Sequence, residues 1–278
     1  MPSPRPRRLR DKVIAIVGLG QIGGSILKRL APHRPAITLL AHDRDRRLAG
    51  VCARYALWVS HLEDLAQEAD LIILAIPVPG IIQTIDALGR IGARRNPKPL
   101  LLDTGTVKSV VAKAAARRRA EFDYIGLHPL AGAEQGGWDA AQAKLFVDRT
   151  IVYTPPRPRR EHEARELIAL LGGVPLAMTA DAHDRYVAEA IGLPHLLAFA
   201  AQGMGGENPL RAGSWASLTR VAASDPEMVA GFLRANAAAQ RRALRTFERQ
   251  LARLKTALGA RSEKSLVKLL SQRQREGE

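Results

Sequence analysis

Near the start of the chain, the pattern G-x-G-x-x-G matches the residues Gly18-Leu19-Gly20-Gln21-Ile22-Gly23. The match follows an apolar, β-branched run at 13–18 and opens a predicted helix, which is the context of dinucleotide-binding loops. Gly18 permits the tight turn, Gly20 lets the backbone approach a pyrophosphate, and Gly23 lets the helix pack closely on the strand. The free N–H groups at the start of the helix would face the phosphates. The loop therefore predicts a dinucleotide cofactor.

An acidic residue, Asp43, lies 20 positions after Gly23, at the end of a second apolar run at 36–41. A carboxylate there would hydrogen-bond the adenosine ribose hydroxyls and repel a 2′-phosphate, which favours NAD over NADP. Arg44 and Arg46 lie beside it and could weaken that preference, so NADP remains possible. The predicted cofactor-binding residues are Gly18, Gly20, Gln21, Ile22, Gly23, Asp43, Pro77 and Asp103.

Two more polar motifs come where predicted strands end. The segment 103–108 lies between a strand at 99–103 and a helix, and its Thr106 hydroxyl either caps that helix or points into the crevice where ligands bind. His128 follows a strand at 124–127 and is held by Pro129. A histidine at the carboxyl end of a strand is a candidate for acid–base chemistry.

The second half of the chain offers a polar face on a helix and an arginine on another. Asp184 and His195 are 11 residues apart, and at about 100° per residue they share one face of a straight helix. That face is either solvated or part of a site. Arg220 lies in a mostly apolar helix, where it either forms a salt bridge or binds an anion, because a bare buried charge is costly.

Alternating strand-like and helix-like runs must position these residues. The alternation up to residue 178 predicts a parallel sheet with helices on both faces, a Rossmann-type α/β domain. Residues 155–160 resemble a linker, but a helix at 161–171 and a strand at 174–178 continue the same sheet. Beyond residue 181 only helices are predicted, at 181–202, 214–222, 226–258 and 262–273. We therefore expect a dinucleotide-binding domain at 1–179 and a helical domain at 180–278.

Composition excludes several classes of protein. The 278 residues carry a net charge of +15 and one cysteine, Cys52, so no disulfide can form within the chain. The longest apolar stretch, 71–82, is interrupted by Pro77 and Pro79 and is too short to span a membrane, and a cytoplasmic protein is expected. Aromatic residues make up only 4%, so nucleic-acid binding is not favoured despite the charge. No cluster of His, Cys or Asp has metal-ligand spacing, and no metal is predicted.

Taken together, the motifs resemble the prephenate/arogenate dehydrogenase family of tyrosine biosynthesis. The resemblance runs in order from about residue 13 to 230, over the glycine loop with Gly24-Ser25, residues 103–108, His128-Pro129-Leu130-Ala131-Gly132, Leu193-Pro194-His195 and Thr219-Arg220. It implies a Rossmann domain followed by a helical domain that forms a homodimer. It also implies NAD-dependent oxidative decarboxylation of prephenate to 4-hydroxyphenylpyruvate, or of arogenate to tyrosine.

The resemblance also assigns roles to single residues. It implies that His128 accepts a hydrogen bond from the ring 4-hydroxyl of the substrate. It also implies that Thr106, at a position where the family commonly has a serine, contacts the same hydroxyl. His195 would contact the substrate side chain, and Arg220 would bind a carboxylate. Finally, Glu134 and Asp184 would network with that arginine at the entrance of the site.

Departures from the family pattern keep alternatives open. They lie near the expected pocket for the substrate side chain, so prephenate and arogenate both remain candidates; the positions are Ile191, Gly192, Ala216, Ser217 and Val229. Another Rossmann reductase of the β-hydroxyacid kind is a rival, but such enzymes usually rely on a lysine on the first long helix of the second domain, and this chain has none there. A protein that senses NAD or binds nucleic acid without catalysis is the rival from another class.

Overall fold

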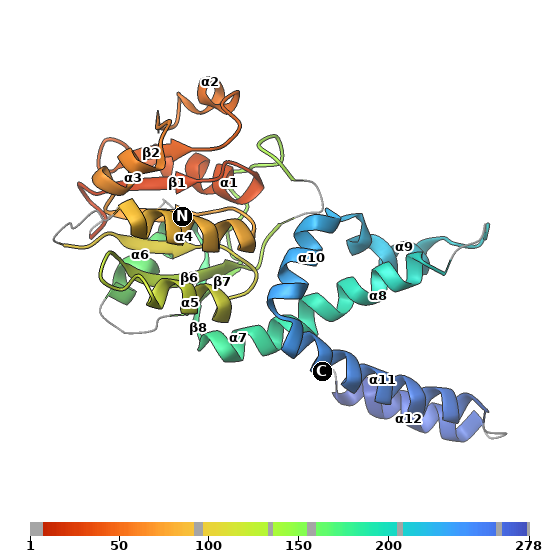
Figure 1. The fold of residues 1–278 in the computed structure, drawn as a ribbon. Coiled ribbons are helices and arrows are strands. Elements are labelled where there is room, and N and C mark those ends of the chain that lie inside the picture. Colours follow the sequence, from red (N-terminus) through yellow and green to blue (C-terminus); the bar gives the residue numbers. More distant parts are fainter. Residues whose placement is uncertain are drawn as a thin grey trace.

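The computed structural model describes residues 8–91, 97–132, 136–154, 160–204, 208–259 and 263–276. Its first part is built on an eight-stranded sheet with the strand order β3-β2-β1-β4-β5-β6-β7-β8 (Figure 1). The strands are β1 Val13–Val17, β2 Thr38–His42, β3 Leu57–Trp58, β4 Leu71–Leu74, β5 Leu100–Asp103, β6 Asp123–Pro129, β7 Thr150–Thr154 and β8 Val174–Ala177.

The first six strands, β1 to β6, are parallel to one another, as predicted. The prediction of a fully parallel sheet is wrong for the last two strands. Strand β7 runs antiparallel to β6, and β8 runs parallel to β7. A parallel pair needs a long crossover, usually a helix, between its strands. In the described part of the β6–β7 connection, at 130–132 and 136–149, the chain forms turns rather than a crossover helix, so β7 returns in the opposite direction.

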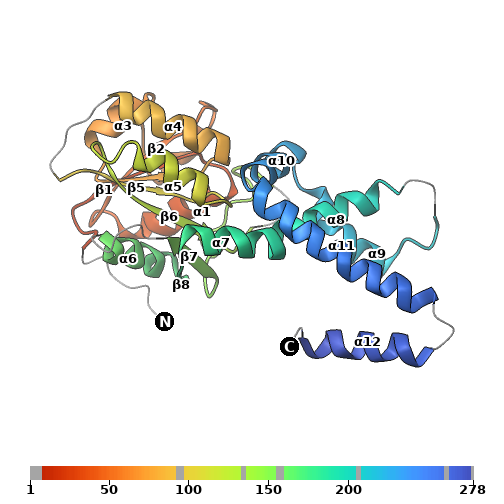
Figure 2. The same ribbon diagram turned by 60° about the horizontal axis from the view of Figure 1, so that its bottom comes forward.

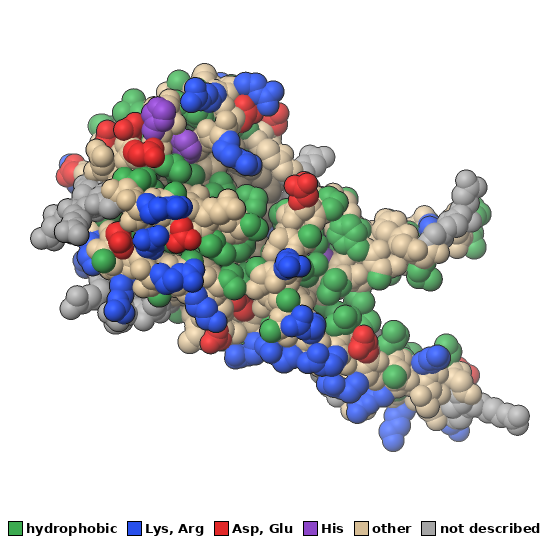
Figure 3. Space-filling view, viewed as in Figure 1, with side chains coloured by type: hydrophobic (Ala, Val, Ile, Leu, Met, Phe, Trp, Pro, Cys, Tyr) green, Lys and Arg blue, Asp and Glu red, His purple; other side chains and the backbone are tan. Residues whose placement is uncertain are grey.

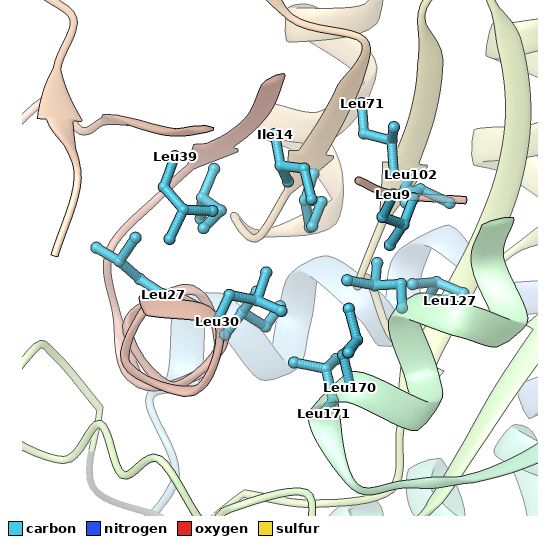
Figure 4. Packing of buried hydrophobic residues seen from close by; sticks show 14 of the residues in the cluster. Leu9, Ile14, Leu27, Leu30, Leu39, Leu71, Leu102, Leu127, Leu170 and Leu171 are labelled. Carbon is cyan, nitrogen blue, oxygen red and sulfur yellow. The ribbon is translucent and has the colours of Figure 1, made fainter. Parts of the chain in front are cut away.

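Helices cover both faces of the sheet because neighbouring strand residues point to opposite sides. In β1, Ile14 and Ile16 join one buried cluster, whereas Ala15 and Val17 join the other. The first cluster packs against helices α1 (Gln21–Leu30) and α6 (Glu161–Leu171), which contribute Leu27, Leu30, Leu170 and Leu171 (Figure 4). The second cluster packs against α3 (Leu62–Glu68), α4 (Val78–Ile91) and α5 (Ser109–Ala116). Helix α2 (Leu48–Cys52) lies between β2 and β3.

The second part of the chain is helical and lies beside the sheet (Figures 1 and 2). Its elements are α7 Ala180–Val187, a π-helix Ala188–Gly192, α8 Leu193–Gln202, α9 Gly213–Thr219, a 3-10 turn Arg220–Ala223, α10 Pro226–Ala235, α11 Ala237–Gly259 and α12 Glu263–Glu276. The predicted helix at 181–202 thus contains a π-helical turn, and the one at 226–258 is divided at Asn236. Helix α10 packs on the sheet domain beside α4 through Val229 and Phe232.

Helices α11 and α12 extend away from the sheet and carry exposed apolar side chains. Leu251, Leu258, Val267 and Leu270 are all about half exposed or more. Figure 3 shows a row of Lys and Arg side chains along α11; its exposed arginines include Arg241, Arg242, Arg245, Arg249 and Arg253. Within the described ranges, no helix is both long enough and apolar enough to cross a membrane.

Candidate active site

The glycine loop connects β1 to α1 and leaves room for a ligand. Gly18 has φ +92°, which L side chains rarely adopt, and a Cβ at Gly23 would collide with the Gly18 carbonyl oxygen. A Cβ at Gly20, by contrast, would have no heavy atom within 4 Å. No side chain caps the start of α1, and its first turn has no acidic residue. This open, uncapped helix N-terminus fits the pyrophosphate of a dinucleotide.

Asp43 is fixed against this loop at the end of β2. Its Oδ2 accepts a hydrogen bond from the backbone N–H of Leu19 at 2.6 Å, and its Oδ1 accepts one from that of Asp45 at 2.8 Å. A carboxylate can accept more bonds than these two, so it can also receive ribose hydroxyls. Arg44 and Arg46 are exposed beside it, while Arg47 is paired with Asp45.

Asp103, one of the predicted cofactor-binding residues, has its carboxylate bonded within the protein core. Asp103 is fully buried, and its carboxylate is bonded to the ammonium of Lys108, the N–H of Gly105 at 2.8 Å and the hydroxyl of Tyr124 at 2.7 Å. Burial lowers the pKa of Lys108, and the negative charge of Asp103 partly offsets this effect by raising it. The carboxylate therefore links the side chains of Lys108 and Tyr124 and the backbone of Gly105 below the edge of the sheet. Pro77, in contrast, is exposed between β4 and α4 at that edge.

A cavity of about 810 Å³ lies between the carboxyl edge of the sheet and the helical part. Thr106, His128, His195 and Arg220, all predicted site residues, line it together. The other lining residues are Pro129, Leu130, Ala131, Gly132, Val152, Leu176, Met178, His183, Tyr186, Val187, Ala190, Ile191, Val221, Ser224, Met228 and Phe232. Glu134 lies outside the described residues.

His128, on β6, is almost completely buried and belongs to a line of three polar groups. Its Nδ1 lies 2.8 Å from Nε2 of His183, and Nδ1 of His183 lies 2.9 Å from Oδ1 of Asp184. Burial holds the pKa of His128 well below its usual value, electrostatic interactions with His183 and Lys108 lower it further, and Asp184 opposes them. His128 is therefore neutral at pH 7 and can accept a proton.

Sequence reasoning missed His183 as the partner of His128. The two residues are 55 positions apart, on β6 and α7, so no local pattern joins them. The adjacent pair His183-Asp184 at the start of a helix was the available signal, because a carboxylate next to a histidine often fixes its ring.

The structure places the predicted site residue Asp184 outside the described lining of this cavity. Its two carboxylate oxygens accept the backbone N–H groups of Lys108 and Ser109, each at 2.8 Å, and so cap helix α5 from the helical part of the chain. Burial raises the pKa of Asp184, but the hydrogen bonds from His183, Lys108 and Ser109 outweigh it and lower the pKa overall. A π-helix, with its wider turn, separates Asp184 from His195, so the segment is not the straight α-helix on which the angular estimate relied.

Thr106 does not cap α5, because that helix starts later and has no local side-chain cap. Its side chain is instead part of the cavity wall, close in the chain to Lys108.

His195 and Arg220 face the cavity from the helical part. Nδ1 of His195 donates to the carbonyl of Ile191 at 2.8 Å, since a carbonyl can only accept, and the ring meets Phe232 edge-on at 5.4 Å. Arg220 follows α9 and is exposed rather than buried. No Asp or Glu is among the described lining residues, so the charge that they present to a ligand is positive.

Of the five departures from the family pattern, only Ile191 lines the cavity. Ala216 and Ser217 are exposed, and Val229 is buried against the sheet domain. Gly192 is buried beneath Gln240 of α11, whose two side-chain polar atoms have no hydrogen-bond partner in the described structure. Among the described residues, no group of three His, Cys, Asp or Glu side chains could hold a metal ion.

Comparisons with known proteins agree with this architecture. Residues 26–174 match the family model described as prephenate dehydrogenase, nucleotide-binding domain, and residues 179–272 match the one described as prephenate dehydrogenase, dimerization domain. A cyclohexadienyl dehydrogenase from Zymomonas mobilis is 32% identical over 272 residues, which cover 90% of this chain and 89% of that protein.

Two solved structures share the fold. A prephenate dehydrogenase from A. aeolicus in complex with hydroxyphenyl propionate and NAD+ aligns with a TM-score of 0.86 over 97% of this chain and 98% of that one, at 22% identity. A Synechocystis arogenate dehydrogenase aligns with a TM-score of 0.79 over 95% of this chain and 98% of that one, at 26% identity.

Proposed function

Because the chain belongs to the prephenate dehydrogenase family and is thus a nicotinamide-dependent oxidoreductase of tyrosine biosynthesis, we propose that it converts prephenate to 4-hydroxyphenylpyruvate with NAD. The observation that carries this proposal is the neutral, buried His128 in a cavity whose described lining holds Arg220 and no carboxylate. This combination suits a substrate that must lose a hydroxyl proton and carries two carboxylates.

In the proposed mechanism, His128 takes the proton of the ring hydroxyl. His128 is a base in its neutral form, and Thr106 in the same cavity orients the hydroxyl by hydrogen bonding. When bound, NAD supplies the acceptor for the hydride from the hydroxyl-bearing carbon. As the carbonyl develops, the ring carboxylate leaves as CO₂ and the ring becomes aromatic. The protein thus has to provide one base and a fixed substrate.

Arg220 and His195 would hold the substrate side chain. A guanidinium binds a carboxylate through paired, charge-assisted hydrogen bonds. Prephenate carries a keto acid there, whereas arogenate adds an ammonium group, which a nearby carboxylate would favour. The described lining residues include no carboxylate to pair with that ammonium group, which supports prephenate as the substrate.

The glycine loop and Asp43 support NAD as the cofactor. The loop leaves space beside Gly20 for the pyrophosphate, and the Asp43 carboxylate stands where it can accept ribose hydroxyls and repel a 2′-phosphate. NADP is the alternative, because the exposed Arg44 and Arg46 nearby could attract its 2′-phosphate. A direct comparison of kcat/KM with the two cofactors tests it.

The helical part, from residue 180 onwards in the proposed division, supports a homodimer. Its match to a dimerization domain agrees with the exposed apolar side chains of α11 and α12, which a second copy would cover. A dimer in sedimentation at micromolar concentration is expected, and a monomer would contradict this part of the proposal.

The proposed function is tested by NADH absorbance with purified protein and either prephenate or arogenate. Turnover with prephenate at the higher kcat/KM is the expected result. A higher kcat/KM with arogenate would reassign the substrate. A His128→Asn variant keeps the ring's approximate size but removes its basicity, and we expect its kcat to fall at least about 100-fold. Undiminished kcat would exclude His128 as the base.

A further inference from the structure

Three buried polar groups from two parts of the chain form one continuous line. Asp184 and His183 lie on α7, and His128 lies on β6, and the three residues are at most 7% exposed. The two contacts in the line measure 2.9 Å and 2.8 Å. Neither the family match nor the proposed mechanism gives His183 a role.

The direction of each hydrogen bond in this line follows from Asp184. Its carboxylate already accepts two backbone N–H groups, and an ionised carboxylate can only accept. Nδ1 of His183 must therefore donate to it, which leaves a lone pair on Nε2 when the ring is neutral. That lone pair accepts from His128, so Nδ1 of His128 carries the proton and its Nε2 does not.

We propose that His183 is a positioning residue that holds His128 in the tautomer with its free lone pair on Nε2, the nitrogen that serves as the base. The proposal rests on the proposed function, in which His128 takes the hydroxyl proton. His183 acts through His128 and needs no contact with the reacting atoms.

The surroundings make this arrangement stiff. Asp184 is bonded to the N-terminus of α5, and its own carbonyl oxygen accepts a hydrogen bond at 2.7 Å from the side-chain amide of Asn236, between α10 and α11. On the other side, the ammonium of Lys108 donates to the carbonyl of Leu127, the residue before His128, at 2.6 Å. The charged and titratable groups that act on His128 are thus Lys108 before α5 and His183 and Asp184 on α7. Both ends of the line are held by the fold, so the ring orientations follow from the structure.

Two substitutions of His183 distinguish the effect of losing the hydrogen-bond acceptor from the effect of changing the size of the side chain. His183→Gln keeps an amide oxygen that can accept from Nδ1 of His128, whereas His183→Leu keeps an apolar volume without an acceptor. We expect His183→Leu to lower kcat about 10- to 100-fold and to leave the KM for NAD unchanged. The loss is smaller than the full rate factor of a general base, because His128 itself is still present. His183→Gln should stay within about five-fold of the wild-type kcat.

A matched control disturbs the same helix without touching the line. The Thr179 hydroxyl caps α7 by accepting from the N–H of Ala182 at 3.2 Å. Thr179→Ala should lower the melting temperature but leave kcat as in the wild type. The control thus measures what loosening α7 costs by itself.

The tautomer can be observed directly in protein with ¹⁵N-labelled histidine. Long-range ¹H–¹⁵N correlations distinguish Nδ1–H from Nε2–H, and the His128 signals are those that disappear in His128→Asn. The wild type and His183→Gln should show Nδ1–H, and His183→Leu should show a mixture of the two forms.

Equal kcat values in His183→Leu and His183→Gln, or an unchanged tautomer in His183→Leu, would overturn the proposal. These outcomes differ from a failure of the proposed function, which would appear as undiminished activity in His128→Asn. If His128→Asn is inactive while His183→Leu behaves like the wild type, His128 is the base and His183 does not position it.

Discussion

The carboxylate of Asp184 accepts the backbone N–H of Lys108 at 2.8 Å, so a residue of α7 caps helix α5, whose N-cap residue lies 76 positions earlier. The first N–H groups of a helix have no partner within it and usually find one in a local side chain. Here the partner comes from the helical part of the chain. The same carboxylate supports His183, and the two parts of the molecule are therefore joined beside His128, the proposed catalytic base.

Replacement of Asp184 by Ala should lower the stability of the protein. It leaves the N–H groups of Lys108 and Ser109, at the start of α5, and Nδ1 of His183 without this acceptor, and we expect the free energy of unfolding to fall by about 2–3 kcal/mol. Urea denaturation measures this. Arg185→Ala, an exposed position on the same helix, is the control and should change it by less than about 1 kcal/mol. Equal losses in both variants would contradict the cap.

The pH dependence of kcat should reflect the lowered pKa of His128. Because burial, His183 and Lys108 hold that pKa well below 6.5, the neutral base persists when the pH falls below 6.5. We expect kcat to be level down to about pH 6.5 and to decline along one ionisation at lower pH. A decline that begins above pH 7 would contradict a buried, neutral His128.

The same pKa affects folding, with a definite sign. A histidine whose folded-state pKa is lowered binds fewer protons when folded than when unfolded. It therefore destabilises the fold as the pH falls through the unfolded value near 6.5, and the loss stops growing below the folded value. Unfolding measurements at each pH separate this effect from the loss of catalytic base.

Arg220→Ala should chiefly raise the KM for prephenate. A contact between a guanidinium and a carboxylate is expected in both the ground state and the transition state, so its loss weakens binding uniformly. We expect KM to rise about 10- to 100-fold while kcat changes little. Steady-state kinetics measure both constants, with the exposed Arg242→Ala on α11 as a control for the loss of one positive charge. A collapse of kcat at constant KM would place Arg220 in the chemical step.

Asp43 should give a preference for NAD of about 10- to 100-fold in kcat/KM, equivalent to roughly 1–3 kcal/mol. In Asp43→Asn the amide no longer repels a 2′-phosphate, and Arg44 and Arg46 lie close enough in the chain to attract it, so the preference should shrink or reverse. Asp64→Asn, an exposed position on α3, should keep the wild-type ratio. Equal kcat/KM for the two cofactors in the wild type would show that the arginines override the carboxylate.

The features that the sequence predicted well are those with a local cause. The glycine loop follows β1 directly, and β4 reads as a continuous apolar run because both of its faces are covered. Thr106 and His128 could be placed together because the carboxyl ends of parallel strands meet at one edge of a sheet.

The features that escaped prediction depend on contacts between distant segments. The direction of β7 depends on a connection without a crossover helix in its described part, and the surroundings of Asp103 depend on Lys108 and Tyr124 reaching into the same buried space. The position of Asp184 relative to His195 depends on a π-helical turn that periodicity arithmetic does not include. Each is a property of the packed molecule rather than of one segment.

Gly192 and Gln240 compete for one volume, and this has a consequence for how the sequence can vary. A Cβ at position 192 would overlap the side-chain amide of Gln240, so a larger residue there requires that this buried amide move or that residue 240 become smaller. The two positions are thus expected to be epistatic: each change alone is harmful, and the pair together is tolerated. Ile191, next to Gly192, lines the cavity. The packing of α11 against this segment therefore restricts which substitutions in the cavity wall the enzyme can accept, in evolution or by design.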